Sequence, residues 1–301
     1  MTTDFRSYHA GELAVQARAG VGGNGLAAGD MYRPAMPLGV QHFLSAQQLA
    51  VLSTQDADGR VWASMRSGPP GFLRALDPVT VEIGGYSHPE DPLMENLAQP
   101  ALAGMLVIQL AARQRIRLNG TARARPGGKI VLTTQQVYGN CPQYIQARAV
   151  IGDRAATAAS AQVGSRLDAR WRRWVEEADT LFIATSHPEA GADASHRGGN
   201  PGFVRVEDES RLLFPDYSGN RMFNSLGNLA ANPRAGLLLP DFQSGAALQL
   251  SGRAQILWDD PRMAQFAGAQ RLLAFDVERV IELPQATRLR FDFQSYSPNL
   301  P

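Results

Sequence analysis

Short runs of apolar residues alternate with turn residues along most of the chain. In the first half, the strand-like runs are Leu49–Ser53, Val61–Ser64, Gly71–Leu76 and Val79–Gly84, and turn pairs such as Asp58-Gly59 separate them. The same texture returns in Leu181–Ala184, Gly202–Val206, Arg211–Phe214, Gly236–Leu239 and Ala247–Ser251. Short apolar runs bounded by Gly, Pro and Asp are typical of β-strands. The pattern therefore predicts two strand-rich regions.

Arg115–Thr121 shows the clearest alternation. Ile116 and Leu118 fall on one face, and Arg115, Arg117 and Asn119 fall on the other. A period of two with one apolar face predicts a half-buried strand.

The chain also contains an internal repeat. Residues 64–73 read SMRSGPPGFL and residues 195–204 read SHRGGNPGFV, so six identities recur at an offset of 131. Asn96-Leu97-Ala98 then matches Asn228-Leu229-Ala230, and Leu118–Ala122 matches Leu250–Ala254, at an offset of 132. Because order and spacing hold over so long a stretch, we infer a tandem duplication of one small domain.

Each copy is predicted to be a small β-barrel with one or two helices. Residues 91–98 and 221–231 are expected to be short helices, since each is followed by a proline that suits a helix end. The predicted fold class is mainly β with helices (α+β), in two tandem barrels. Residues 153–178 carry one helical apolar stripe, and their arginine-rich polar face is interpreted as solvated. The expected organisation is an N-terminal arm (1–44), a first copy (45–150), a connecting helix (151–178) and a second copy (179–301).

Composition and charge argue against several classes of protein. The chain has 29 basic and 28 acidic residues and a formal charge of +1, which argues against a nucleic-acid-coating protein. One cysteine, Cys141, excludes an internal disulfide and a cysteine-based zinc site. No stretch of about 18 apolar residues exists, so we expect no membrane span. The N-terminus lacks the order of charges and apolar core of a signal peptide, and we expect a cytoplasmic protein.

The common catalytic motifs are absent. The sequence contains no nucleophile elbow, P-loop or His-Glu-x-x-His run. The five histidines show no i, i+3 or i+4 pair, so no metal site is predicted.

The second copy holds the richest group of polar residues. Ser195–Arg205 and Phe214–Ser225 place three arginines beside two glycine-rich turns, and Asn224 and Ser225 stand where a short helix begins. A helix start with Ser and Asn side chains and nearby Arg is a good phosphate cradle. The alternative is that these segments are ordinary hairpin turns with exposed arginines.

These residues carry a family resemblance. SHRGGNPGFVRV, LLFPDYSGNRMFNSLGNLAANPRAGLLL and LQLSGRA resemble the pyridoxamine 5'-phosphate oxidase-like, FMN-binding split-barrel superfamily, in its uncharacterised oxidase-related branch. The run from Tyr138 to Ile145 also resembles a segment that follows the barrel in such proteins. The resemblance implies a six-stranded antiparallel split barrel that holds FMN, usually at a dimer interface.

The resemblance also implies a cofactor site in the second copy. Val204 and Arg205 lie on the strand whose basic residue contacts the FMN phosphate, and Pro215 and Asp216 lie where backbone faces the isoalloxazine ring. His196 is a candidate for the substrate side, although a turn histidine is the alternative. Further phosphate contacts are expected from Arg197, Asn220, Arg221, Asn224 and Ser225.

The first copy departs further from the pattern. Ile83-Gly84-Gly85-Tyr86 stands where the second copy has Phe214-Pro215-Asp216-Tyr217. We hypothesise that the first copy has lost its own site and closes over a flavin bound by the second. In the second copy, Asn224-Ser225 replaces the Arg-Lys pair of the true oxidase, which argues against pyridoxamine phosphate as substrate.

The expected function is that of an FMN-dependent oxidoreductase that transfers a hydride through flavin N5, with a small-molecule substrate or a nicotinamide reductant. The alternatives are a non-catalytic flavin binder and a haem- or deazaflavin-binding split barrel. Cys141 is a candidate near the flavin, or a small core residue. Exposed barrel edges favour a homodimer.

Overall fold

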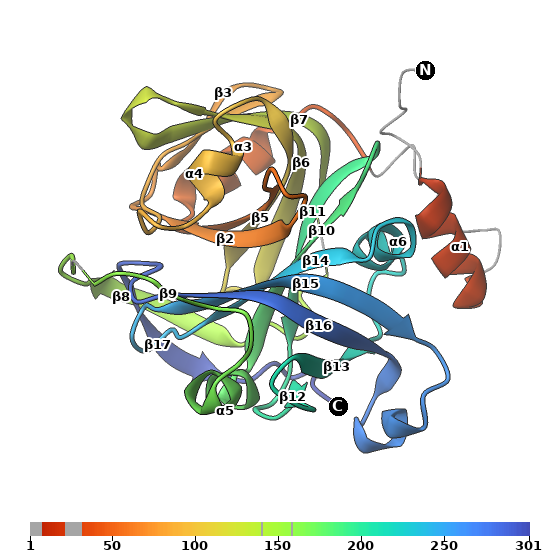
Figure 1. The fold of residues 1–301 in the computed structure, drawn as a ribbon. Coiled ribbons are helices and arrows are strands. Elements are labelled where there is room, and N and C mark those ends of the chain that lie inside the picture. Colours follow the sequence, from red (N-terminus) through yellow and green to blue (C-terminus); the bar gives the residue numbers. More distant parts are fainter. Residues whose placement is uncertain (1–7, 22–31, 140, 158) are drawn as a thin grey trace.

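The computed structural model describes residues 8–21, 32–139, 141–157 and 159–301. Two antiparallel β-sheets dominate it (Figure 1). The first sheet contains β1 (Leu49–Gln55), β2 (Val61–Ser67), β3 (Leu73–Asp77), β4 (Thr80–Ile83), β5 (Ala101–Gln109), β6 (Gln114–Arg125) and β7 (Lys129–Gly139). The second contains β9 (Gln162–Gly164), β10 (Thr180–His187), β11 (Gly191–Gly198), β12 (Arg205–Val206), β13 (Arg211–Tyr217), β14 (Arg234–Pro240), β15 (Ala247–Leu257) and β16 (Ala269–Leu283).

Helices and a small third sheet complete the fold. β8 (Ala147–Asp153) pairs with β17 (Leu289–Ser295), so the C-terminal end of the chain lies against the segment that joins the copies. The helices are α1 (Ala10–Arg18), α3 (Leu38–Ala46), α4 (Leu93–Asn96), α5 (Ala169–Glu177) and α6 (Asn224–Ala231), with short 3-10 turns η1 (Pro126–Gly128) and η2 (Pro261–Gln265). No helix in the described part of the chain is both long and apolar enough to cross a membrane.

The two large sheets have the same topology. The first runs β2-β1-β5-β6-β7-β4-β3 and the second runs β11-β10-β14-β15-β16-β13-β12, which is the same order strand for strand. Both long hairpins shift register at matching places, Asn119/Gly120 and Ser251/Gly252. This agreement supports the duplication and confirms the predicted mainly β fold with two tandem barrels.

Three large apolar cores stabilise the described part of the chain. One fills each barrel, and the third lies between the barrels. The third core combines side chains of β2 and β5 with side chains of β10, β11 and β14, including Met65, Leu106, Phe182 and Leu238. The barrels can approach closely because glycines face backbone: a Cβ on Gly104 would lie 2.6 Å from the Ala192 carbonyl oxygen, and one on Gly236 would lie 2.6 Å from that of Val61.

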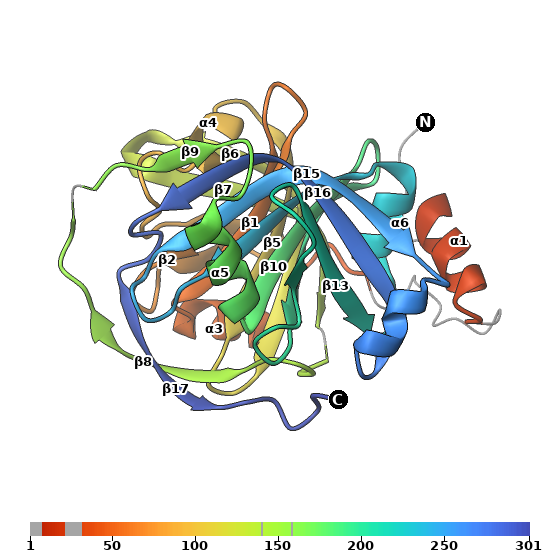
Figure 2. The same cartoon turned by 60° about the horizontal axis from the view of Figure 1, so that its bottom comes forward.

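Outside the barrels the sequence predictions need correction. The predicted helix over 153–178 is only α5, because residues 147–153 and 162–164 pair as strands. Leu167, Trp171 and Val175 are buried as the helical stripe predicts, whereas Val163 is 51% exposed on β9. Figure 2 shows α5 lying across the second sheet. Within the predicted N-terminal arm, 1–7 and 22–31 fall outside the described residues, and α1 packs on α6 of the second copy.

We predict that Gly104→Ala lowers the free energy of unfolding by about 1–3 kcal/mol, because the added methyl forces the two barrels apart. The measurement is urea denaturation. Gly139→Ala is the matched control, since Gly139 is an exposed strand residue with open space around its Cα. Equal stability of the two variants would show that the inter-barrel contact is not tight.

Candidate functional site

Two adjoining pockets lie where the barrels meet. The first, which we call the histidine pocket, has a volume of about 60 Å³ and includes Arg115, Cys141, Tyr144, His196 and Phe203 in its lining. The second, the helix pocket, has a volume of about 50 Å³ and includes Asp216, Arg221, Phe223, Asn224 and Ser225. They form one site because they share Arg117, Ser195, Arg197, Tyr217, Gly219 and Asn220.

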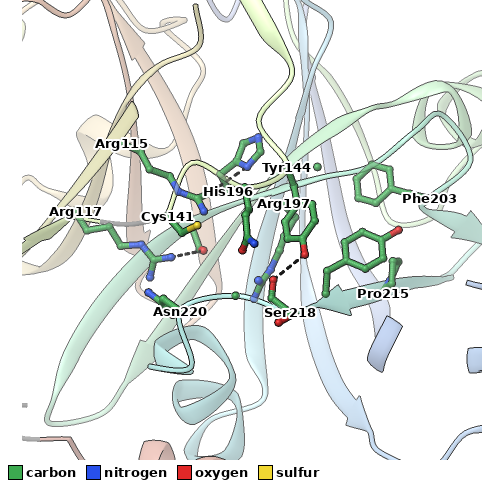
Figure 3. A pocket seen from close by; sticks show the side chains of 15 residues that line it. Arg115, Arg117, Cys141, Tyr144, His196, Arg197, Phe203, Pro215, Ser218 and Asn220 are labelled. Atoms are coloured by element: carbon green, nitrogen blue, oxygen red, sulfur yellow. Dashed lines mark hydrogen bonds between the residues drawn. The ribbon is translucent and has the colours of Figure 1, made fainter. Parts of the chain in front are cut away.

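Side chains reach this site from both copies. Arg115 and Arg117 come from β6 of the first copy, and Ser195, His196 and Arg197 come from β11 of the second. Figure 3 shows the two β6 arginines on one side of the histidine pocket, with Phe203 and Pro215 on the other. The site is therefore built by the contact between the barrels.

The turn before α6 shapes the helix pocket. Arg221 and Phe223 both adopt the left-handed backbone conformation with φ of 59°, and α6 begins directly afterwards at Asn224. Tyr144, on the other side of the site, has φ of 66°. Such backbone conformations are costly for residues with side chains, and they cluster at functional sites. The start of α6 also presents unpaired backbone N–H groups, which favour an anion.

A buried ion pair joins the copies beneath the pockets. Arg117 donates through Nη1 to both Asp193 carboxylate oxygens, at 3.0 and 3.1 Å, and through Nη2 to Ser195 Oγ at 2.6 Å. The Asp193 carboxylate also accepts hydrogen bonds from Tyr138 and Ser225. Asp193 is 2% exposed, so its charge is stabilised by these partners rather than by water.

Arg115 carries a charge that no carboxylate balances among the described residues. Its Nη1 lies 3.2 Å from His196 Nδ1, and its Nε is buried without a hydrogen-bond partner in the described part of the chain. Burial and the neighbouring guanidinium groups of Arg117 and Arg197 lower the pKa of Arg115 to about 9. The guanidinium is still charged at neutral pH, and a bound anion would stabilise it.

His196 is held neutral. Burial, followed by the charges of Arg115 and Arg197, lowers its pKa well below the usual value. With Nδ1 accepting from Arg115, the proton lies on Nε2, which has no partner among the described residues. His196 is 3% exposed, so it offers one buried N–H donor at the histidine pocket.

Asp216 organises the second-copy arginines. It lies 3.1 Å from Arg197 and 2.6 Å from Arg271, and it is 3% exposed. One carboxylate thus faces two guanidinium groups, and Arg197 Nε has no partner in the described part of the chain. This arrangement leaves positive charge at the site.

Most of the predicted site residues come together here. His196, Arg197, Pro215, Asp216, Asn220, Arg221, Asn224 and Ser225 all line one or both pockets. Val204 and Arg205 do not. Val204 is fully buried in the second-barrel core, and Arg205 donates to Gln265 and stacks 4.4 Å over Phe266. Only Arg205–Val206 of the predicted strand is regular, and it pairs at the sheet edge, which turns Arg205 away.

Sequence reasoning missed Arg115 and Arg117. The alternation along β6 did place both on the polar face of a strand. That face packs against the second copy, and a single sequence does not show which barrel face meets which. Cys141 also lines the histidine pocket. In the described residues, no group of three His, Cys, Asp or Glu side chains could hold a metal ion.

The matching position, where β2 of the first copy meets β15 of the second, lacks the two cations that β6 supplies to the inter-barrel site. By the offset of the repeat, Ala247 and Gln249 replace Arg115 and Arg117. The Gln249 amide donates to Asp91, a buried carboxylate that also accepts from Ser64. Arg66, the counterpart of Arg197, donates to the Gly84 and Gly128 carbonyls. This position therefore holds one buried arginine and one buried carboxylate, each with hydrogen-bond partners of its own.

The N-terminal helix α1 packs against α6, the helix whose first residues line the helix pocket. Glu12 accepts a 2.6 Å hydrogen bond from the Asn224 amide, and His9 lies 3.0 Å from Asn228 of α6. Burial is the main cause that raises the pKa of Glu12 from 4.5 to about 7. The contact of α1 with α6 therefore depends on pH.

Comparison with known proteins gives one family match. Residues 167–296 match the family model of pyridoxamine 5'-phosphate oxidase. No curated protein matches the chain.

Several solved structures are similar over the length of one copy. HupZ of Group A Streptococcus is 11% identical, over 40% of this chain and 98% of its own, with a TM-score of 0.32. An FAD-binding protein from Mesorhizobium loti is 14% identical over 40% and 96%, with a TM-score of 0.30. A Clostridium acetobutylicum protein related to general stress protein 26 is 15% identical over 40% and 89%, with a TM-score of 0.28.

We predict that Glu12→Gln removes a pH dependence of stability. Because the folded-state pKa lies above the unfolded value, the carboxyl group stabilises the fold at low pH, and this contribution is lost as pH rises from 4.5 through 7. The free energy of unfolding of the variant, relative to the parent, should rise by about 3 kcal/mol between pH 4.5 and 8. Urea denaturation across this range measures it. Parallel curves would mean that Glu12 titrates normally.

Proposed function

We propose that the site between the barrels binds FMN and that the protein is an FMN-dependent oxidoreductase. One observation carries the proposal. Arg115, Arg117 and Arg197 converge from two copies on a buried site, and each has a guanidinium Nε without a partner among the described residues. Such a concentration of guanidinium charge is costly unless an anion completes it.

The helix pocket suits the phosphate end of the cofactor. Arg117, Arg197 and the exposed Arg221 line it, together with Asn224 and Ser225 at the start of α6. Guanidinium forks and a helix N-terminus together are a strong phosphate-binding arrangement. The Asn224 and Ser225 side chains are committed to Glu12 and Asp193, so their backbone groups are the ones available.

The histidine pocket supplies flat walls but little enclosed space. Phe203, Pro215 and Tyr217 line it, and the Tyr144 ring lies against that of Tyr217, with centroids 5.1 Å apart and planes tilted by 42°. A volume of about 60 Å³ holds a few waters, on the order of four. A ring system larger than the pocket therefore requires the lining residues to rearrange.

Bound FMN would supply hydride transfer at N5, which no side chain here can perform. The neutral His196 Nε2–H would donate a hydrogen bond to a polar ring atom, and the arginines would stabilise negative charge on the cofactor. A nicotinamide reductant, a small-molecule substrate and a homodimer belong to this proposal. The first copy contributes Arg115 and Arg117 but binds no flavin, because Asp91 and Gln249 occupy its own site.

The first test is the absorption spectrum of the purified protein, with the released cofactor identified by mass and counted per chain. We expect one FMN per chain and oxidation of NADH or NADPH. Two FMN per chain would contradict the loss of the first-copy site. A Soret band or a deazaflavin mass would establish the corresponding alternative. A colourless protein that takes up no added FMN would refute flavin binding, and bound FMN without turnover would indicate a non-catalytic flavin binder.

We predict that Arg221→Ala and Arg197→Ala each raise the Kd for FMN about tenfold or more, because each removes a charge-assisted contact to the phosphate. Arg74→Ala is the matched control, since Arg74 pairs with Glu82 on the first copy. Arg205→Ala should also leave the Kd unchanged. Titration of the apoprotein, followed by quenching of FMN fluorescence, measures all four. Loss of binding in Arg205→Ala alone would move the phosphate site to the β12 edge.

A further inference from the structure

The largest cavity among those described lies elsewhere. It is a groove of about 730 Å³ between α5, the β8–β17 sheet and the loop after β14. We call it the arginine groove, because its lining includes Arg148, Arg154, Arg170, Arg173 and Arg290. Its size falls in the range of small-molecule sites, about 300–1,000 Å³.

The charge of the groove is positive. Five arginines line it, against the carboxylates of Glu177, Asp179 and Asp241. Asp179 is engaged by Arg148 and Thr180, and Asp241 accepts from Ser244 and backbone N–H groups. Three of the arginines are exposed. Arg170 pairs with Glu282, whereas Arg173 on α5 and Arg290 on β17 have no ion pair among the described residues.

Arg148 shows that the groove is organised for a ligand. Its side chain is only 10% exposed, and it stacks over Phe242 at 4.4 Å and Phe293 at 5.3 Å. Nη2 donates to Asp179, whereas the buried Nη1 has no partner within the described residues. A guanidinium fixed between two aromatic rings with a free N–H is positioned to donate to an incoming anion.

The walls also favour a flat ring. Trp174, Phe291 and Phe293 line the groove beside the arginines, and Phe293 is 45% exposed. Aromatic faces and guanidinium planes both stack on planar groups. Arg154 holds the C-terminal strand in place by donating to the carbonyls of Leu289 and Gln243.

We propose that the arginine groove is a second ligand site, separate from the inter-barrel site, that binds a planar aromatic ring carrying a phosphate or a carboxylate. The two sites do not share a lining residue. Between them lies Gln146, fully buried, whose amide donates to the carbonyls of Gly199 and Asp179. A ligand in the groove therefore contacts none of the residues that line the inter-barrel pockets.

The test uses the full chain and four probes: AMP, benzoate, adenosine and inorganic phosphate. Isothermal titration calorimetry gives each Kd, and quenching of tryptophan fluorescence reports contact with Trp174. We expect AMP or benzoate to bind at least about tenfold more tightly than adenosine or phosphate, because only these join a ring to an anion. The better of the two identifies the ligand as a phosphate or a carboxylate. Quenching should be lost in Trp174→Leu.

The variants locate the site. Arg173→Ala/Arg290→Ala should raise the Kd of the better probe about tenfold or more, whereas Arg172→Ala should leave it unchanged. Arg172 is the matched control, since it is the exposed neighbour of Arg173 and does not line the groove. Arg221→Ala, which alters only the inter-barrel site, should also leave it unchanged. Binding that is lost in Arg221→Ala but kept in the double variant, or no binding of AMP or benzoate at millimolar concentration, overturns the proposal.

Discussion

The cross-barrel ion pair between Arg117 and Asp193 is the interaction on which the inter-barrel site depends. Taking both charges out of water is costly, and the cost is met only because Ser195, Tyr138 and Ser225 complete the hydrogen bonds. The pair fixes β6 of one barrel against β11 of the other. It also fixes the start of α6, because Ser225 belongs to that helix. The ion pair thus holds β6, β11 and α6 in a single arrangement around the pockets.

The two copies share their backbone structure but differ in the side chains that line their pockets. Strand order, the register shifts at Gly120 and Gly252, and the inter-barrel glycines all match. These features satisfy backbone geometry, which both barrels share. Side chains at the pockets have no such constraint, so Gln249 stands in one copy where Arg117 stands in the other.

The internal repeat and the local residue patterns predicted the two barrels and the segments that form the site. The offset of 131–132 residues led to two equal barrels, and the turn residues around Gly219 and Asn220 led to the site segments. Arg115 and Arg117 could not be assigned, because their role arises only when one barrel face meets another. Arg205 does not line either pocket, and it lies on the edge strand β12, which is regular over two residues only. Likewise, the residues before α5 belong in part to β8, which pairs with β17, and to β9, which pairs with β16. A helical stripe alone does not reveal this pairing.

Covalent linkage of the two barrels has a consequence for how the inter-barrel site assembles. Where such a site forms between separate subunits, dilution dissociates the subunits and dismantles it. Here β6 and β11 belong to one polypeptide, so their meeting is an intramolecular event whose extent does not vary with protein concentration. A single gene also encodes β6 and β11 once each, so the two sides of the site can change independently. The site can thus form at any protein concentration, because the first barrel is always present beside the second.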